Sequence, residues 1–400
     1  MCAGSRVRTL ANRVPLRVAF TNIPRRIWAG GHNYQNNLFA LLNRYCPGEV
    51  LPVMFAGLGD DAADLASIAQ IPDVEVVRSP GFDRRRAGLA AALALGLDRA
   101  AAAEFRASRI DVVFESARFF GWRLPFPAIA WFPDFQHRRL PHYFSAATRW
   151  RRELGFRAQI AAGRTILLSS ESALRDFRRF YPRSTGDISV VRFASWPAAS
   201  AMSADPAAVT AQYDLPPRYF YLPNQFWRHK NHQAAVDALA ILKRRGLDVV
   251  IAASGSKDDP RELNYFGNLM QEVARHGLEE NFRYLGMIPL AHVYALLRGS
   301  TALINPSRIE GWSTTVEEAK SFGVPMILSD IDVHREQTGG AALYFGADDA
   351  EALANHLSAS LQEGKPVVVR DLLPDLDDRA RAFATSFANM IRQTVEATRV

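Results

Sequence analysis

The chain has 400 residues, of which 48% are hydrophobic and 22% are charged, and this composition excludes wholesale disorder. Its length suits two domains of roughly 200 residues, each with its own core. The chain has only two cysteines, Cys2 and Cys46, which makes a disulfide framework implausible. No apolar run has the length of a signal peptide or a membrane span, so we expect a cytoplasmic protein.

The net charge of +7 is distributed unevenly along the chain. Residues 1–200 contain 28 Arg, no Lys and 16 acidic residues, which gives +12; the other half has 48 − 28 = 20 basic and 41 − 16 = 25 acidic residues, or −5. A basic first half could face nucleic acid, anionic lipid or a phosphorylated acceptor. A solvated surface in a protein that prefers Arg to Lys would give the same count.

Short apolar runs alternate with helical patterns in chain order. The first run, Leu16–Asn22, precedes a loop with Pro and Gly and then a helical pattern over Asn33–Tyr45. Later strands are expected at Glu49–Phe55, Val74–Arg78, Ile110–Glu115, Ala128–Phe132, Thr165–Ser169, Tyr219–Leu222, Val249–Ala253, Phe282–Tyr284, Ala302–Ile304, Met326–Ser329 and Ala342–Phe345. Apolar runs separated by helices predict parallel sheets covered on both faces.

The alternation lapses once, over Trp196–Arg218, where Ala, Ser and Pro indicate a linker with one short helix. We therefore predict an α/β protein with two Rossmann-like, doubly wound parallel-sheet domains that face a central cleft. The first would span residues 1–200 and the second 201–375, and a helix over 376–400 would return toward the first domain. Ligands of such sheets bind beyond the carboxyl ends of the strands, so the cleft is the expected active site.

The segment after the predicted strand Ala302–Ile304 places two carboxylates around the start of a helix. Thr314 fits the N-cap of a capping box with Glu317 as its partner, so Glu318 would lie one turn inside the helix and Glu310 in the loop before it. The free N–H groups of a helix N-terminus favour a phosphate, and carboxylates accept hydrogen bonds from sugar hydroxyls. The arrangement suits a nucleotide sugar, although two solvated glutamates would show the same spacing.

The same segment resembles a known motif. Seven residues separate Glu310 from Glu318, and the stretch from Glu310 to Pro325 is similar to the E-x7-E motif of retaining GT-B glycosyltransferases of family 4. The segment 223–232 resembles that family's phosphate-binding turn. The likeness extends through the second half of the chain and is found in the first half chiefly at Pro133–Ser145.

The resemblance implies the GT-B fold and transfer of a sugar from a nucleoside diphosphate sugar to the hydroxyl of a glycan or lipid-linked acceptor, with retention of the anomeric configuration. It assigns Glu310 to the donor sugar, Glu318 to the ribose and Lys230 to the diphosphate. Further donor contacts are implied at Gly311, Trp312, Ser313 and Thr314, the last three through their backbone N–H groups. No protein nucleophile, cofactor or metal ion is implied.

The predicted phosphate-binding turn departs from the family at one position. The family's arginine five residues before the lysine is Gln225 here, and Arg228 is the candidate that supplies the missing charge. Arg228, His229, Lys230 and His232 crowd the start of a helix predicted over residues 231–244, where cations oppose the helix dipole unless an anion is bound. A solvent-exposed basic turn is the alternative.

Two loops of the first half provide further candidates. Gly30 and Gly31 open a helix after the first strand, so their backbone could approach the diphosphate, although a glycine pair also suits an ordinary turn. Asp134 and His137 follow the predicted strand Ala128–Phe132 and are candidate catalytic residues for contacts with the acceptor or the sugar. Pro133 stands where the family often has a histidine.

The sequence shows no metal-binding pattern, because it has neither H-x3-H on a clear helix nor an apolar-flanked D-x-D. Two alternatives to a glycosyltransferase stay open: a GT-B epimerase or phosphorylase, against which the E-x7-E geometry argues, and a basic nucleic-acid-binding protein without catalysis. Against the latter, the arginines are dispersed and no recognition motif is present, so we expect no nucleic-acid partner.

The first half has two regions suited to a membrane surface. Arg84, Arg85 and Arg86 precede the apolar stretch Ala87–Leu97, and four arginines, at positions 149, 151, 152 and 157, surround Trp150 and Phe156. Basic residues beside an apolar helical face are typical of interfacial segments, so we expect peripheral, reversible contact with anionic lipid on the inner face of the membrane. A helix packed in the core is the alternative.

Overall fold

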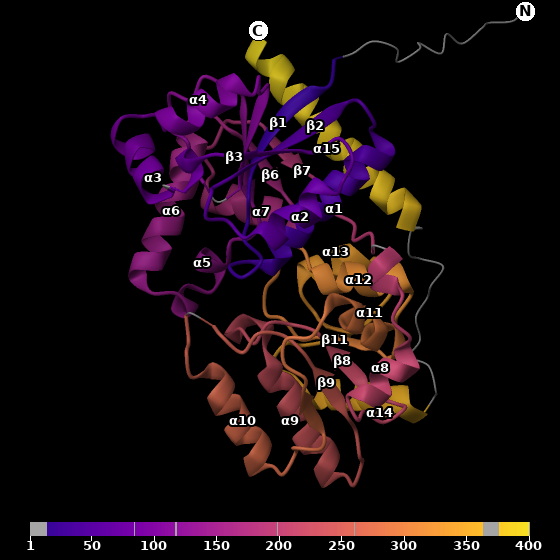
Figure 1. The fold of residues 1–400 in the computed structure, drawn as a ribbon. Coiled ribbons are helices and arrows are strands. Elements are labelled where there is room, and N and C mark those ends of the chain that lie inside the picture. The colour runs from indigo at the N-terminus through magenta and orange to yellow at the C-terminus, as the bar shows by residue number, and fades with distance from the viewer. Residues whose placement is uncertain are drawn as a thin grey trace, which may run out of the picture.

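The computed structural model describes residues 14–83, 85–116, 118–197, 199–259, 261–362 and 376–399. They form two α/β domains, drawn one above the other in Figure 1. Each domain contains a parallel sheet, and helices cover both faces of it. This is the architecture predicted from the alternation of strands and helices.

The first domain contains a seven-stranded sheet in the order β3-β2-β1-β4-β5-β6-β7. Its strands are β1 (Leu16–Thr21), β2 (Val50–Ala56), β3 (Glu75–Arg78), β4 (Val112–Ser116), β5 (Ala128–Phe132), β6 (Thr165–Leu168) and β7 (Ile188–Val190). All neighbouring pairs among them are parallel. The edge strand β7 was not predicted, because its three half-buried residues have no apolar run around them.

The helices of this domain are α1 (Ala29–Tyr45), α2 (Ala62–Ala69), α3 (Arg85–Ala94), α4 (Arg99–Ala107), α5 (Gln136–Arg139), α6 (Ala146–Ala161) and α7 (Glu171–Phe180). Helix α1 begins one turn before the predicted start at Asn33. The predicted pattern missed this turn because glycines carry no apolar side chain that would mark a helical face.

The second domain contains a six-stranded sheet in the order β10-β9-β8-β11-β12-β13. Its strands are β8 (Phe220–Leu222), β9 (Ile251–Ala253), β10 (Phe282–Tyr284), β11 (Leu303–Asn305), β12 (Met326–Ser329) and β13 (Leu343–Phe345). Its helices are α8 (Pro206–Gln212), α9 (His232–Arg244), α10 (Tyr265–Arg275), α11 (Leu290–Gly299), α12 (Thr314–Phe322), α13 (Asp332–Thr338) and α14 (Ala350–Gln362). The four central strands, β8, β9, β11 and β12, are fully buried, as helical cover on both faces requires, whereas the edge strands β10 and β13 are partly buried.

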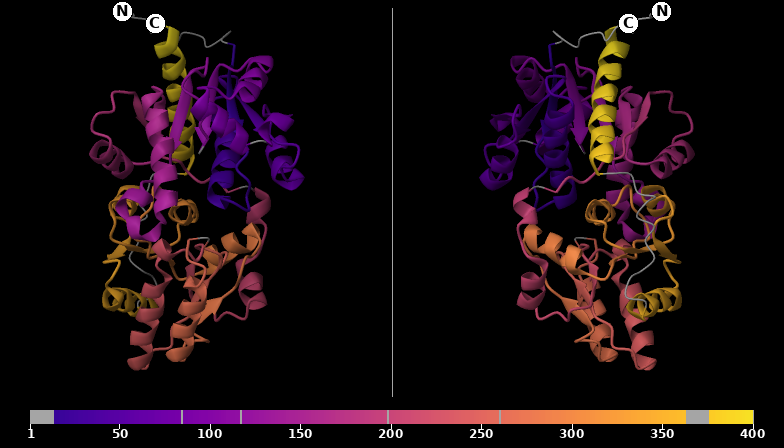
Figure 2. Two further views of the ribbon diagram at one scale, coloured as in Figure 1. Left: turned by 90° about the vertical axis from the view of Figure 1, so that its left-hand side faces the viewer. Right: turned by 90° about the vertical axis from the view of Figure 1, so that its right-hand side faces the viewer.

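The last helix, α15 (Leu376–Arg399), lies along the first domain, as both views of Figure 2 show. Phe387 packs between strands β1 and β4, with ring centroids 6.2 Å from Phe20 and 5.7 Å from Phe114. The first turn of α15 remains in contact with the second domain, because Arg379 Nη1 lies 2.6 Å from Glu317 Oε2 in α12. Helix α15 therefore connects the core of one domain to the other.

Candidate functional site

A cleft of about 380 Å³ opens where the carboxyl ends of the two sheets meet. The first domain contributes Asp134, which follows β5, and the first turns of α7, while the second contributes Arg308–Gly311 after β11 and Ile331–Val333 after β12. The volume lies in the range of small-molecule sites, about 300–1,000 Å³. Since ligands of doubly wound sheets bind at this edge, the cleft is the candidate active site.

Glu310 and Lys230 form an ion pair at the wall of this cleft. Lys230 ends a short 3₁₀ turn after β8, and Glu310 lies in the loop after β11, the strand beside β8 in the sheet. Lys230 Nζ is 2.6 Å from Glu310 Oε1, and the two side chains are 14% and 8% exposed. The fold thus joins two groups that the sequence places 80 residues apart.

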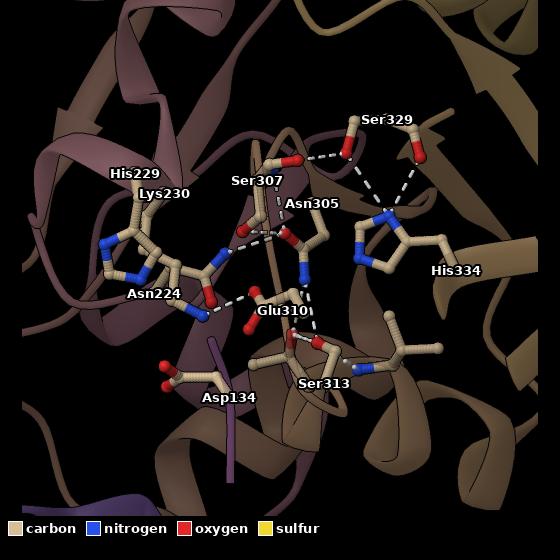
Figure 3. A network of polar contacts seen from close by, with 12 residues as sticks. Asp134, Asn224, His229, Lys230, Asn305, Ser307, Glu310, Ser313, Ser329 and His334 are labelled. Atoms are coloured by element: carbon tan, nitrogen blue, oxygen red, sulfur yellow. Dashed lines mark hydrogen bonds and ion pairs between the residues drawn. The ribbon is translucent and has the colours of Figure 1, made fainter. Parts of the chain in front are cut away.

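A buried amide holds the loop that carries Glu310. Asn305, the last residue of β11, donates from Nδ2 to Ser313 Oγ at 2.9 Å and to Thr315 Oγ1 at 3.2 Å. Its Oδ1 accepts from the backbone N–H of Ser307 at 3.2 Å and from Ser307 Oγ at 2.7 Å. Figure 3 shows this network beside the Lys230–Glu310 pair. A side chain with both donors and acceptors therefore ties the loop to α12.

The start of α12 differs from the prediction at Thr314. The N-cap is Ser313, whose Oγ accepts from the N–H of Val316 at 3.5 Å, so the predicted capping box with Glu317 is wrong. The N–H of Ser313 is donated to Gln337 Oε1 at 3.0 Å. This donor is already used within the protein, which leaves the predicted contact of Ser313 with the diphosphate without support.

Glu317 belongs to a buried ion cluster. Its carboxylate accepts from Lys320 Nζ at 2.8 Å, from Gln337 Nε2 at 3.2 Å and from Arg379 Nη1 at 2.6 Å. The carboxylate thus serves tertiary contacts between α12, α13 and α15, which a local sequence pattern does not reveal.

Glu318 lies beneath the cleft and does not line it. The residue is 5% exposed, and Tyr294 donates its hydroxyl to Oε1 at 3.4 Å. Burial raises the pKa of the Glu318 carboxyl to about 8. At neutral pH the carboxyl is therefore mainly protonated and can donate a hydrogen bond as well as accept one.

Gln225 and Arg228 lie in the turn after β8, where the family has an arginine that this chain lacks. Gln225 accepts from the N–H of Ser256 at 2.8 Å and thereby joins the loops after β8 and β9. Arg228 turns outward: Nη1 is 3.2 Å from Glu262 Oε2, the guanidinium lies 4.8 Å from the Tyr143 ring centroid, and the side chain is half exposed. Arg228 is therefore poorly placed to replace the family's arginine.

The two histidines of this turn are buried and neutral. Burial lowers the pKa of His229 well below its usual range and lowers that of His232 to about 3. His232 stacks on Phe226 with ring centroids 4.0 Å apart. The predicted crowding of four cations at the start of α9 is therefore wrong in part, because Arg228 and Lys230 alone among these four residues carry charge.

A different arginine lies beside His229. Arg261 Nη2 is 3.3 Å from His229 Nδ1, and its guanidinium sits 5.1 Å from the Trp227 ring centroid and 5.3 Å from that of Phe144, a residue of the first domain. Arg261 Nη1 donates across the domain interface to Gln136 Oε1 at 3.4 Å. Sequence reasoning missed Arg261, although its place after β9 was a signal: β8 and β9 are neighbours, so their following loops meet.

The first domain brings a second cation to the same place. Arg152 of α6 donates from Nη2 to Asp134 Oδ1 at 2.8 Å, and Asp134 also accepts from the backbone and side chain of Gln136. The charge of Arg152 acts on buried His229 of the other domain. The sequence analysis placed Arg152 in the membrane cluster; the structure turns it inward to the cleft.

His137, the second candidate after β5, faces the interior of the first domain. It is 2% exposed, Nε2 lies 3.4 Å from Glu153 Oε2, and the ring packs edge-on against Phe156. Burial lowers the pKa of His137. Asp134 lines the cleft, whereas His137 is buried in the first domain and does not line it.

Gly30 and Gly31 form the first turn of α1, and the side chain of Trp28 folds back over them. A Cβ on Gly31 would lie 2.3 Å from the Trp28 ring. This ring stacks on Trp131 of β5 with centroids 5.1 Å apart. The glycines thus have a packing role that does not depend on a ligand.

Gly311 lies directly against the backbone of the first domain. A Cβ at this position would lie 1.6 Å from the Pro133 carbonyl oxygen, so the two backbones touch here. The next residue, Trp312, donates from Nε1 to the carbonyl of Phe193 at 2.9 Å. The loop carrying Glu310 is thereby docked on the first domain at two points, and the Trp312 indole serves that docking.

The described part of the chain contains neither a metal-binding cluster nor a membrane-spanning helix. In it, no group of three or more His, Cys, Asp or Glu side chains is arranged to hold a metal ion. No described helix combines the length and the apolar character that crossing a bilayer requires.

The second domain matches a family of known function. Residues 217–363 match the family model described as Glycosyl transferases group 1. The O-antigen chain mannosyltransferase B of Escherichia coli is 33% identical over 135 residues, which are 32% of this chain. The match spans 33% of that relative's length.

Solved structures resemble the whole chain. A glycosyltransferase from Rickettsia africae superimposes with a TM-score of 0.62 at 16% identity, covering 96% of this chain and 97% of that one. Sucrose-phosphate synthase from Thermosynechococcus elongatus gives 0.65 at 14% identity, with 96% and 98% covered. Anabaena HepE in complex with UDP and glucose gives 0.62 at 15% identity, with 96% and 99% covered. These likenesses show the GT-B fold.

Proposed function

Because the second domain belongs to the glycosyl transferases group 1, we propose that this chain transfers a sugar from a nucleoside diphosphate sugar to a hydroxyl acceptor, with the anomeric configuration retained. One observation carries the proposal: the buried Lys230–Glu310 pair on the cleft wall, inside the matched region. HepE, one of the structural neighbours, binds UDP and glucose, which supports a donor of this kind.

The donor's diphosphate would bind between three cations. Lys230 and Arg261 come from the second domain, and Arg152 comes from the first. Arg261 takes the role that the sequence analysis gave to Arg228. It pairs with buried Asp259 through Nε at 2.9 Å, but its guanidinium also lies beside buried His229 and reaches Gln136 of the first domain, whereas that of Arg228 points to Glu262. Cations held in place before the reaction stabilise the charge that develops on a leaving diphosphate.

Glu310 would act on the sugar. When the diphosphate attracts Lys230, the Glu310 carboxylate loses its partner and becomes able to accept hydrogen bonds from sugar hydroxyls. The acceptor hydroxyl then attacks the anomeric carbon on the face from which the diphosphate departs, and a phosphate oxygen takes its proton. The protein contributes positioning and electrostatic stabilisation, with no covalent intermediate.

Glu318, which is buried and lies outside the cleft lining in the free protein, would contact the ribose once donor binding exposes its carboxyl, and the two domains would hold the donor between them. The O-antigen relative supports a place in cell-surface polysaccharide or glycolipid synthesis. The epimerase and phosphorylase alternatives share the GT-B fold and are separated from a transferase by the product formed.

Reversible contact with an anionic membrane is a second part of the proposal. On α6, Trp150 is 73% exposed and lies between the exposed residues Arg149 and Arg151. The adjacent helix α3 packs on α6 through Ala92, and its neighbours Leu89 and Leu95 are exposed. Figure 1 shows α3 and α6 side by side. Arg84 lies outside the described residues, as do the side chains of Arg85 and Arg86.

The proposed transfer is tested with a panel of nucleoside diphosphates and nucleotide sugars. We expect one nucleoside diphosphate to raise the melting temperature, since a ligand at about 100 times its dissociation constant stabilises by roughly 2.7 kcal/mol. The matching nucleotide sugar should release its diphosphate faster when an acceptor is present, and NMR of the product should show the donor's anomeric configuration. No stabilisation by any nucleotide would contradict the proposal.

Metal independence is tested on the same reaction. Turnover should persist in excess EDTA, because Lys230, Arg152 and Arg261 provide the positive charge that a divalent ion would otherwise supply. Turnover lost in EDTA and regained with Mg²⁺ or Mn²⁺ would overturn this part.

A further inference from the structure

We propose that the outer part of the cleft, between Glu310 and the first turns of α7 and α13, binds the acceptor as an uncharged saccharide. This inference rests on the proposed transfer reaction and adds to it the chemical class of the acceptor. The cleft volume of about 380 Å³ leaves room beyond Glu310 for a small glycan.

The charges of the cleft disfavour an anionic acceptor. Its ionised lining residues are four carboxylates and two guanidinium groups: Asp134, Asp176, Glu310, Asp332, Arg139 and Arg308. Both arginines are already held by carboxylates, Arg139 by Asp176 at 3.0 Å and Arg308 by Asp348 at 2.6 Å. A ligand phosphate would have to compete with these carboxylates for either arginine.

Donor binding would make the cleft still more negative. Glu310 and Asp134 are neutralised in this structure by Lys230 and Arg152. Once those cations turn to the diphosphate, two carboxylates face the acceptor without a cation beside them. An acceptor that carries a phosphate or a carboxylate would then be repelled at short range.

The N-terminus of α7, one of the two helix starts that border the cleft, is closed to anions. In α7, the N–H groups of Glu171 and Ser172 are donated to Glu336 of the other domain at 2.9 and 3.1 Å. The N–H of Ala173 is donated to Ser170 Oγ at 2.9 Å. A helix N-terminus is a common phosphate site, but here a carboxylate from α13 already occupies it.

The same surface suits a neutral sugar. Carboxylates accept hydrogen bonds from hydroxyl groups, and the Arg139–Asp176 pair offers donors and acceptors side by side. Phe135, Leu140 and Ile309 also line the cleft and offer apolar contact to the C–H faces of a sugar ring. Asp176 lines the cleft from α7, in the other domain from Lys230 and Glu310, so it should discriminate between acceptors.

The first experiment compares matched acceptors with the wild-type protein and its nucleotide sugar. The probes are methyl glycosides of mannose, glucose and galactose, together with the 6-phosphate and the uronate of each. We expect at least one neutral glycoside to accelerate release of the nucleoside diphosphate, and its charged forms to show kcat/KM lower by about tenfold or more. Equal or better use of a charged form would overturn the inference.

The second experiment changes Asp176. Asp176→Asn should raise the acceptor KM by about tenfold while leaving the nucleotide dissociation constant unchanged. Because the substitution leaves Arg139 without its partner, Asp176→Asn combined with Arg139→Gln removes both charges and should show the same rise in KM. Asp330→Asn, which breaks the exposed Asp330–Arg335 pair outside the cleft lining, is the control and should change neither constant.

The experiments distinguish a failure of the proposed transfer reaction from a failure of the inference about the acceptor. If no nucleotide binds and no nucleotide sugar reacts, the transfer reaction itself is wrong. If the donor reacts but only charged acceptors are used, or Asp176→Asn and the double variant leave the acceptor KM unchanged, the inference about the acceptor is wrong while the transfer reaction stands.

Discussion

At the scale of residues, charged side chains around the cleft form cation–carboxylate pairs, and a bound ligand can separate the two members of a pair. Lys230 with Glu310 and Arg152 with Asp134 each combine a cation suited to phosphate with a carboxylate suited to sugar. Such pairs neutralise buried charge in the free protein, which would otherwise be costly. A diphosphate with an attached sugar satisfies both members of a pair at once, so binding releases the carboxylate to the sugar and the cation to the phosphate.

Lys230 and Arg261 should contribute more to nucleotide affinity than Arg228 does. Lys230→Ala and Arg261→Ala each remove a charged hydrogen-bond donor worth about 1.5–3 kcal/mol, so we expect a loss of roughly 10- to 150-fold. Arg228→Ala serves as the control and should change affinity by less than about threefold, because an exposed pair such as Arg228–Glu262 contributes little. Isothermal titration calorimetry with the nucleoside diphosphate measures all three, and a larger loss in Arg228→Ala than in Arg261→Ala would reverse our assignment.

Because of Glu318, the free energy of unfolding of the free protein should decrease as the pH rises. Burial raises the pKa of its carboxyl to about 8, from an ordinary 4.5, so the folded state holds this proton more tightly than the unfolded state does. The stabilisation is complete below about pH 4.5 and is lost progressively up to pH 8, with a slope of up to about 1.4 kcal/mol per pH unit.

Urea denaturation at pH 6 and pH 8 measures this effect. Glu318→Gln keeps the shape of the side chain without the ionisable group, so its free energy of unfolding should fall less between the two pH values than that of the wild type. Parallel pH dependence in the two proteins would show that Glu318 is not the group responsible.

At the scale of elements, the loop from β11 to α12 is the most constrained part of the site. Asn305 ties it to α12, Gly311 touches the backbone of Pro133, and Trp312 bonds to Phe193. These contacts hold Glu310 against the first domain, so the site is complete only when the domains are together.

Gly311→Ala tests this dependence. The added Cβ would lie 1.6 Å from the Pro133 carbonyl oxygen, which no rotamer change can relieve, so the domains should separate slightly and turnover should fall by about 100-fold with the fold retained. Small-angle X-ray scattering should show a larger radius of gyration. Gly155→Ala in α6, where a Cβ meets nothing within 4 Å, is the control and should retain full turnover. Normal activity in Gly311→Ala would mean that the contact is dispensable.

At the scale of the whole molecule, the first domain should bind anionic vesicles reversibly. Each Lys or Arg near such a surface contributes about 1 kcal/mol within a Debye length of about 8 Å, and the exposed Trp150 adds apolar insertion. Cosedimentation with phosphatidylserine vesicles should fall between about 50 and 500 mM salt and should drop when Trp150, Arg149 and Arg151 become Ser. Equal recovery with neutral vesicles would leave the basic half without this role.

Many arginines of the basic first half form ion pairs within the protein. Of its arginines, Arg17, Arg118, Arg138 and Arg164 each pair with a carboxylate in the same domain. The net charge of the sequence thus overstates the charge available to a partner, and it gives the nucleic-acid alternative no particular support.

The fold was predictable because strand alternation depends on local patterns. Six strands of the first sheet and all six of the second lie within or beside the predicted ranges, and Glu310 and Lys230, which were expected to contact the same donor, lie after neighbouring strands. The misses depend on tertiary contacts: Ser313 replaces Thr314 as N-cap because Asn305 and Gln337 fix it there. Arg261 is far from any motif, and only the pairing of β8 with β9 brings it to His229.

Helix α15 also determines how the domains can move. The chain passes from the first domain to the second before α8, and it has returned by the start of α15, whose core contacts lie with Phe20 and Phe114. Because the chain crosses between the domains twice, twisting and sliding of one domain against the other are restrained more than a single crossing would restrain them. We expect the remaining motion to be mainly a separation at the contact between Gly311 and Pro133. Substrate entry, catalysis and product release would then lie along a single coordinate, which a label on each domain could follow as one distance.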